Sequence, residues 1–122
     1  MLLVAACLVA TASGLEPVRL AGEYDGTGTD ILGRHYRVQV RIRPEGAAYR
    51  VWWAGADGRE FVGVGLRTGR QLAVSWAGRA DEGRVFVGLT VYTVRRDGTL
   101  DGRWTMFGSR GRVHAETLTP AG

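Results

Sequence analysis

The side chains best suited to metal binding or acid–base chemistry are two histidines, His35 and His114, and the nearby carboxylate of Glu116. A zinc site would need all three to converge on one ion, at about 2 Å from each ligand atom. The histidines lie in different predicted strands, which would be roughly 10 Å apart if the last strand pairs with the first. Alternation beside the charged Arg37 and Arg112 also places both histidines on an outward face. The sequence therefore predicts no metal site and no cofactor.

Nucleophilic catalysis lacks its usual signature. Ser13, Ser75 and Ser109 have no histidine and carboxylate partners nearby in the sequence, and no G-x-S-x-G segment is present. Cys7 is the only cysteine, so cleavage of an export signal after Ala12 would leave no thiolate, disulfide or cysteine-based metal site. We therefore expect a protein that is not an enzyme.

Residues 1–12 have the properties of an export signal. They carry no charge, and their apolar run leads into the small-residue triplet Ala-Thr-Ala at 10–12, which fits a cleavage site. The run is too short for a transmembrane helix, and the missing basic region predicts a true start upstream of Met1. The segment that ends at Cys7 also fits a lipobox, so acylation of Cys7 is the alternative to the favoured cleavage after Ala12. Both routes predict a secreted or periplasmic protein.

Charge and composition argue against a nucleic-acid partner. The formal net charge is +4, and all 16 basic residues are arginine, with neither lysine nor asparagine in the chain. This skew is typical of coding bias in a GC-rich bacterium and needs no polyanionic partner to explain it. The 122 residues suffice for a signal over 1–12, a linker over 13–18 and one β domain over 19–119.

Past the signal, polar and apolar residues alternate with a period of two, which is typical of β-strands. Short segments that contain glycine separate the alternating runs and suit tight hairpin turns. Eight strands are predicted, over 19–27, 34–43, 48–54, 59–66, 71–77, 84–94, 99–107 and 112–118. The short links between consecutive strands predict an all-β, antiparallel up-and-down meander.

One face of each predicted strand is apolar, and closing the sheet into an eight-stranded barrel would bury these faces and remove exposed edges. The expected inward residues are Tyr36, Val38, Val40, Ile42, Tyr49, Val51, Trp53, Val62, Val64, Leu66, Leu72, Val74, Trp76, Val85, Val87, Leu89, Val91, Leu100, Trp104, Met106 and Val113. These large side chains predict a filled interior rather than a pocket of several hundred cubic ångströms.

The pattern L-x-G-x-aromatic occurs twice, over 20–24 and over 100–104. Both copies place the leucine, the glycine and the ring on the inward face. A glycine between two bulky inward residues lets a large ring from a neighbouring strand lie against the backbone. We interpret Gly22 and Gly102 as packing devices.

The meander of short strands that begins with Gly-x-aromatic resembles calycin-type barrels, and its size and topology are similar to the avidin branch. The whole mature chain resembles small secreted bacterial proteins of unknown role, some of them labelled fibronectin-binding. The segments that support this resemblance are G-V-G-L at 63–66, L-A-V-S-W at 72–76, G-T-L-D-G-R-W at 98–104 and E-T-L-T at 116–119.

The resemblance implies a barrel that can bind a small apolar ligand in its interior. The biotin site of avidins resembles a ring of polar residues around tryptophan, and this chain has no asparagine and places leucine, valine and glycine there, so biotin binding is not expected. Under this alternative hypothesis, the ligand-binding residues are Tyr24, Tyr36, Trp53, Trp76 and Trp104.

The outward face of the fourth to sixth predicted strands holds no charge, unlike the other outward faces. A flat, uncharged sheet face suits the same face of another copy. Our leading hypothesis is therefore a secreted or periplasmic, non-enzymatic binding or interaction module that docks a homodimer or protein partner there. The interface candidates are Trp52, Phe61, Gly63, Gly65, Ala73, Ser75, Phe86, Gly88, Thr90 and Tyr92.

Overall fold

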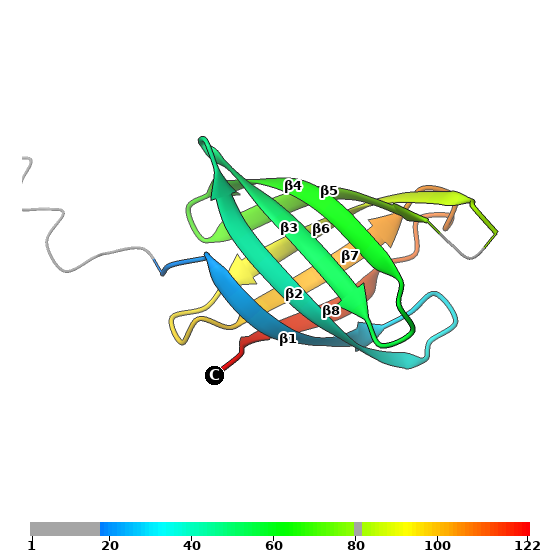
Figure 1. Cartoon of the computed structure of the whole chain (residues 1–122), viewed down its shortest axis with the longest axis horizontal. Helices are drawn as coiled ribbons and strands as arrows, with labels where there is room; N and C mark the ends of the chain where they lie inside the picture. The colour runs from blue at the N-terminus through cyan, green and yellow to red at the C-terminus, as the bar shows by residue number, and fades with distance from the viewer. Residues whose placement is uncertain (1–17, 80–81) are drawn as a thin grey trace, which may run out of the picture.

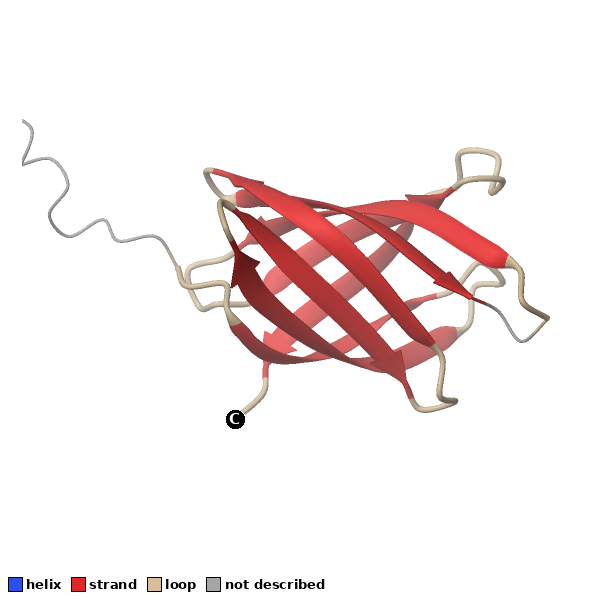
Figure 2. Cartoon of the chain, turned by 45° about the horizontal axis from the view of Figure 1, so that its top comes forward, coloured by secondary structure: helices blue, strands red, loops and turns tan. Residues whose placement is uncertain are grey.

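The computed structural model describes residues 18–79 and 82–122 and shows a closed, antiparallel barrel of eight strands in meander order (Figures 1 and 2). The strands are β1 (Gly22–Thr29), β2 (His35–Glu45), β3 (Ala48–Gly55), β4 (Glu60–Thr68), β5 (Gln71–Arg79), β6 (Val85–Val94), β7 (Leu100–Met106) and β8 (His114–Pro120). The pairing of β1 with β8 closes the barrel. The predicted fold class is confirmed, and every predicted strand is present.

The predicted export signal over 1–12, with Cys7 and Ala12, lies outside the described residues. So does nearly all of the predicted linker over 13–18. No helix in the described part of the chain is long and apolar enough to cross a membrane.

The two ends of the barrel differ. The β1–β2, β3–β4, β5–β6 and β7–β8 connections lie at one end, and the chain enters at the other, on the left of Figure 1. At this second end, the segment before β1 folds across the barrel, and the hydroxyl of Tyr24 donates a hydrogen bond to the carbonyl of Leu20 (2.7 Å). Arg67 donates to the carbonyl of Val18 (2.5 Å) and fixes the same segment. We call this the closed end and the opposite one the open end.

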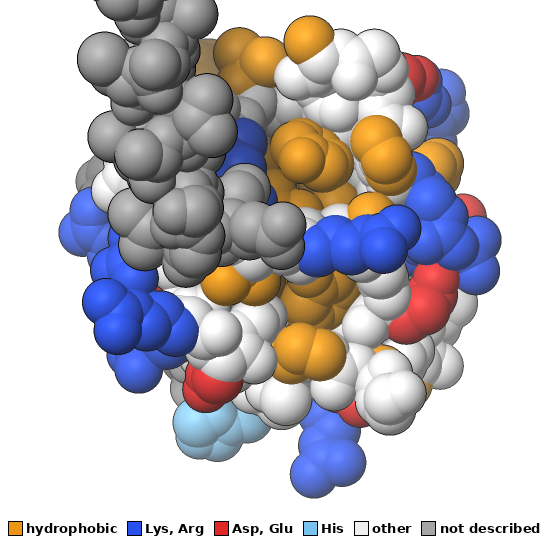
Figure 3. All heavy atoms as spheres, turned by 90° about the vertical axis from the view of Figure 1, so that its left-hand side faces the viewer, with side chains coloured by type: hydrophobic (Ala, Val, Ile, Leu, Met, Phe, Trp, Pro, Cys, Tyr) orange, Lys and Arg blue, Asp and Glu red, His pale blue; other side chains and the backbone are white. Residues whose placement is uncertain are grey.

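Apolar side chains fill the closed half of the barrel. Figure 3 looks at the closed end and shows apolar side chains gathered near its middle, with basic side chains around the edge that also reach across toward the middle. The side chains buried there come from the entering segment and seven of the strands: Leu20, Tyr24, Ile42, Val51, Leu72, Val94, Leu100 and Leu118.

The predicted facing of the side chains is correct in β2, β3, β5 and β7 and wrong in β4, β6 and β8. The predicted inward residues that instead point outward are Val62, Val64, Leu66, Val85, Val87, Leu89, Val91 and Val113. The predicted outward residues that instead point inward are Phe61, Gly63, Gly65, Phe86, Gly88, Thr90 and Tyr92. His114 and Glu116 also point inward, contrary to prediction, because they share the parity of the buried Leu118.

Limited interior volume explains the reversal. An eight-stranded barrel is only wide enough for its side chains to fill, so bulky inward residues on one strand require small ones on the next. In one row across the sheet, Val51, Gly63, Trp76 and Gly88 follow one another on β3 to β6. Glycine therefore takes the inward positions beside Trp76, and the valines and leucines next to these glycines on β4 and β6 face outward.

Candidate functional site

A cavity of about 410 Å³ occupies the open end of the barrel. Its walls and floor include Tyr36, Val38, Trp53, Phe61, Trp76, Thr90, Trp104 and Glu116, and its rim includes Asp30, Arg37, Asp57 and Arg59. The expectation of a filled interior is therefore correct only for the closed half.

Aromatic rings form a continuous wall along one side of the cavity. Phe61 and Trp76 meet edge to face, with ring centroids 5.4 Å apart, and Trp76 meets Trp104 in the same way at 6.0 Å. Trp104 packs in turn on the imidazole of His114 at 4.6 Å. Such contacts between rings fix their orientations, so this side of the cavity is preformed.

Gly88 explains how the indole of Trp76 reaches across β6. A Cβ atom at Gly88 would lie 2.5 Å from Cη2 of Trp76 and 2.6 Å from the carbonyl oxygen of Thr105. Only glycine leaves room for a ring this close to the backbone. Trp76 Nε1 donates a hydrogen bond to Thr90 Oγ1 (2.9 Å), two residues further along β6, which sets the indole in one orientation.

The carboxylate of Glu116, only 5% exposed, lies at the floor of the cavity and accepts hydrogen bonds from three neutral donors. The Tyr36 hydroxyl donates to Oε1 (2.7 Å), and Trp53 Nε1 donates to Oε2 (3.1 Å). The Tyr92 hydroxyl also donates to Oε2. Trp53 Nε1 lies 3.3 Å from the Tyr92 oxygen as well, so the four side chains form one buried network, which we call the Glu116 clamp.

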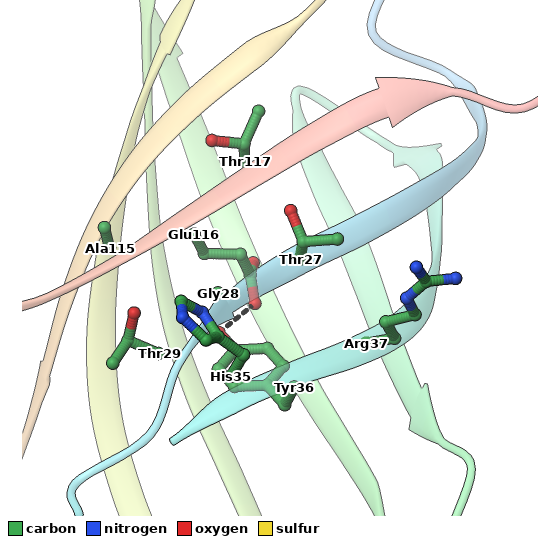
Figure 4. Close-up of a pocket in the computed structure, with 9 residues that line it drawn as sticks. All are labelled: Thr27, Gly28, Thr29, His35, Tyr36, Arg37, Ala115, Glu116 and Thr117. Carbon is green, nitrogen blue, oxygen red and sulfur yellow. Dashed lines mark hydrogen bonds between the residues drawn. The ribbon is translucent and has the colours of Figure 1, made fainter. Parts of the chain in front are cut away.

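Two glycines make the Glu116 clamp possible. In one row from β6 through β7, β8 and β1 to β2, the inward residues are Tyr92, Gly102, Glu116, Gly28 and Tyr36. A Cβ at Gly102 would lie 2.7 Å from the Tyr92 ring, and one at Gly28 would lie 2.5 Å from the Tyr36 ring. Each tyrosine therefore leans over a glycine to reach the carboxylate, as Figure 4 shows for Tyr36. The predicted packing role of Gly102 is confirmed. The same role predicted for Gly22 is wrong, because a Cβ atom at Gly22 would have no neighbouring atom within 4 Å.

Burial and the carboxylate change the acidity of the two tyrosines. Burial raises the pKa of Tyr92 well above its ordinary value, and the negative charge of Glu116 raises it further. The same two causes, in the same order, raise the pKa of Tyr36. Both phenols therefore stay protonated and act as donors throughout the physiological pH range.

The rim of the cavity is polar and is organised by two turns. Asp30 accepts hydrogen bonds from the backbone N–H groups of Leu32 and Arg34 (both 2.9 Å), and these bonds lower its pKa. Asp57 accepts from the backbone N–H of Arg59 (3.0 Å) and pairs with the Arg59 guanidinium at 3.4 Å. The acidic side chains of the rim thus have structural partners of their own.

Four of the five predicted ligand-binding residues meet at this cavity: Tyr36, Trp53, Trp76 and Trp104. Tyr24 does not, because it is buried at the closed end. Glu116, Phe61 and Thr90 also line the cavity, although the sequence predicts Phe61 and Thr90 on an outward interface and no role for Glu116 in ligand binding. Glu116 lies two residues before the apolar Leu118 and so faces the same way on β8, which indicates an inward position. The prediction that Val113 faces inward placed Glu116 on the outward face instead.

The described residues at the open end do not form a metal site. Among residues 18–79 and 82–122, no three histidine, cysteine, aspartate or glutamate side chains form a cluster that could hold a metal ion. His35 faces outward on β2, and β1 lies between that strand and β8, which carries His114. Figure 4 shows His35 beside a shallow depression on the outer wall, together with Thr27, Thr29, Arg37 and Thr117.

The central part of the outer wall over β4 to β6 is uncharged, with the exposed Glu60 and Arg79 at its open-end edge, and most of the residues that form it are not the predicted ones. Of the predicted interface residues, only Trp52, Ala73 and Ser75 face outward and are exposed. We define the β4–β6 face as Trp52, Val62, Val64, Leu66, Ala73, Ser75, Ala77, Val85, Val87 and Leu89. The exposed fractions of its β4 side chains run from 40% for Val62 to 65% for Leu66.

No protein-family model matches the chain, and no curated protein matches it.

Proposed function

We propose that this protein is a calycin-like, non-enzymatic carrier that binds a small, largely apolar molecule in the cavity at the open end of its barrel. The observation behind the proposal is the 410 Å³ cavity lined by five aromatic side chains. A cavity of this size and lining, with a few convergent polar groups, is typical of sites for small organic ligands. Ile31, Leu32 and Phe107 are exposed on the loops of the same end and provide an apolar approach to the opening.

The test is a titration with the neutral fluorescent probe N-phenyl-1-naphthylamine, whose emission rises in apolar surroundings. Val38→Phe adds a ring at a cavity-lining position, whereas Gln39→Phe adds the same ring on the outer wall. We expect saturable, one-to-one uptake by the wild type and by Gln39→Phe, and at least a tenfold weaker affinity in Val38→Phe. Equal uptake by both variants would refute binding inside the barrel.

We propose that the carrier works outside the cytoplasm, on the basis of the uncharged segment over 1–12. The mass of the chain recovered from the periplasm or culture medium of an expression host tests this. A chain that begins at Ser13 is expected. Recovery of a full-length chain from the cytoplasm alone would contradict export, and a diacylated chain that begins at Cys7 would identify a lipoprotein.

We also propose, as a second function, that the protein associates with a second copy of itself through the β4–β6 face. The small residues Ala73, Ser75 and Ala77 on β5 lie between larger aliphatic residues on β4 and β6, so we expect a groove between two aliphatic ridges. A ridge of one copy fits the groove of the other, so the face is complementary to itself about a two-fold axis.

The extent of the β4–β6 face suits such a dimer. From the exposed fractions of its side chains, it presents roughly 700 Å² of surface, close to the ~800 Å² per partner of a standard protein interface. It also exceeds the apolar patches of most monomeric proteins, which are about 300–600 Å² at their largest.

Light scattering on the purified chain tests the dimer. We expect twice the monomer mass for the wild type and for Thr117→Arg, which adds a cation to the opposite wall. Val64→Arg places a charge at the centre of the β4–β6 face and is expected to give monomers. A monomeric wild type at all concentrations would refute the second function.

A further inference from the structure

We infer that the ligand of the open-end cavity is a cation whose charge sits on an alkylated nitrogen, such as a quaternary ammonium group. This inference rests on the proposed ligand-binding function and adds the chemical class of the ligand. It follows from three properties of the site: its net charge, the hydrogen bonds already made by Glu116, and the aromatic lining.

The cavity has a net negative charge. Its rim includes two carboxylates, Asp30 and Asp57, and two guanidinium groups, Arg37 and Arg59, whose charges balance. Glu116 is then the charge left over, and none of the ion pairs found within 18–79 and 82–122 involves it. Buried charges in proteins are usually paired, so this carboxylate creates a site that favours a cation.

The carboxylate offers charge but little hydrogen-bonding capacity. Its two oxygens have about four acceptor positions, and Tyr36, Tyr92 and Trp53 already occupy three of them. A primary ammonium ion needs three acceptors, which this floor does not supply. A quaternary nitrogen has no N–H group that needs an acceptor, and it is more weakly hydrated than a primary ammonium ion.

The aromatic lining suits the same group. Tyr36, Trp53, Phe61, Trp76 and Trp104 all line the cavity. Aromatic rings attract cations through the negative potential of their faces, and clusters of such rings recognise quaternary ammonium groups. An anionic ligand would instead meet the uncompensated charge of Glu116 with no cation on the floor to receive it.

The experiment compares choline with 3,3-dimethylbutan-1-ol, which has the same shape but a neutral carbon in place of the charged nitrogen. Binding is followed through the indole N–H signals in two-dimensional NMR at pH 8. Trp53, Trp76 and Trp104 report on the cavity, and the exposed Trp52 is an internal control. We expect choline to shift the three cavity signals with at least a tenfold lower Kd than the alcohol.

Variants assign the preference to the carboxylate. Glu116→Gln removes the charge with little change in shape and is expected to lower choline affinity at least tenfold while changing the affinity for the alcohol by less than threefold. Glu60→Gln removes an exposed carboxylate that lies outside the cavity lining and is expected to keep the wild-type ratio. If Glu116→Gln does not fold, the wild-type comparison of choline with the alcohol decides alone.

The outcomes separate this inference from the proposed function. Equal or tighter binding of the alcohol, or no binding of either compound while N-phenyl-1-naphthylamine still enters the cavity, overturns the cation preference and leaves the carrier function standing. Failure of the naphthylamine as well overturns the carrier function itself.

Discussion

Removing the acceptor of the Glu116 clamp should destabilise the barrel, because it leaves two buried donors without a partner at once. Glu116→Met keeps a side chain of similar length but leaves the hydroxyl protons of Tyr36 and Tyr92 without their acceptor. Trp53 Nε1 keeps the Tyr92 oxygen as a partner at 3.3 Å. Each stranded buried donor costs about 1–3 kcal/mol. Part of this cost is offset because a carboxylate no longer has to be buried, so we expect a net loss of about 2–4 kcal/mol.

A double-mutant cycle tests the physical reason for that loss. In the wild type, Tyr36→Phe removes a hydrogen bond to a charged acceptor and should cost about 1.5–3 kcal/mol. In the Glu116→Met background, the same change removes a hydroxyl that has already lost its acceptor, so it should be neutral or stabilising. The expected coupling between the two sites is therefore about 1.5–3 kcal/mol, far above the error of additive behaviour.

The assay is urea unfolding followed by tryptophan fluorescence, with the free energy of unfolding extrapolated to water. Tyr49→Phe, on the same inward side of the barrel but outside the Glu116 clamp, is the matched control and should be additive with Glu116→Met. A loss below 1 kcal/mol for Glu116→Met, or simple additivity with Tyr36→Phe, would refute the reasoning.

Three further predictions concern pH and packing. Because folding raises the pKa of Tyr36 and Tyr92, the unfolded chain loses these protons first, and the unfolding free energy should fall above pH 10 by about 1.4 kcal/mol per pH unit for each tyrosine. A flat stability profile between pH 10 and 11 in urea titrations would contradict this. Gly88→Ala should destabilise the barrel by about 1–3 kcal/mol, because the new Cβ meets Trp76, and it should shift the Trp76 indole signal in NMR; an unshifted signal would argue against the contact. Tyr24→Phe should cost about 1 kcal/mol in urea unfolding yet leave probe binding unchanged, since its hydrogen bond lies at the closed end; weaker binding would show that the two ends are coupled.

The architecture could be predicted from the sequence because its determinants are local. Period-two alternation in segments such as 36–42, together with glycine-containing turns, specifies strands and hairpins without knowledge of the final packing. The facing of β4 and β6 could not be predicted by the same rule. There the inward positions are Gly63 and Gly88 because Trp76 lies between them, and this constraint exists only once the strands are paired in register.

The sequence predicts the aromatic residues of the cavity but not the buried carboxylate at its floor. Trp53, Trp76 and Trp104 share the parity of aliphatic core residues on their own strands, so their inward direction follows from the sequence. The position of the cavity depends on which end of the barrel the entering segment closes. That segment is held at the closed end by the hydrogen bond from the Tyr24 hydroxyl on β1 to the carbonyl of Leu20. The buried position of Glu116 contradicts the ordinary preference of carboxylates for solvent, and only the two neighbouring glycines and two tyrosines explain it.

The position of a bound probe tests whether this barrel binds a ligand in its interior. In isotope-filtered NMR, N-phenyl-1-naphthylamine bound to the labelled protein should show contacts with the indole protons of Trp53, Trp76 and Trp104 and none with Trp52. Contacts instead with Trp52 and the methyl groups of Val62 and Val64 would place the probe on the β4–β6 face, and would contradict the claim that this barrel binds its ligand inside.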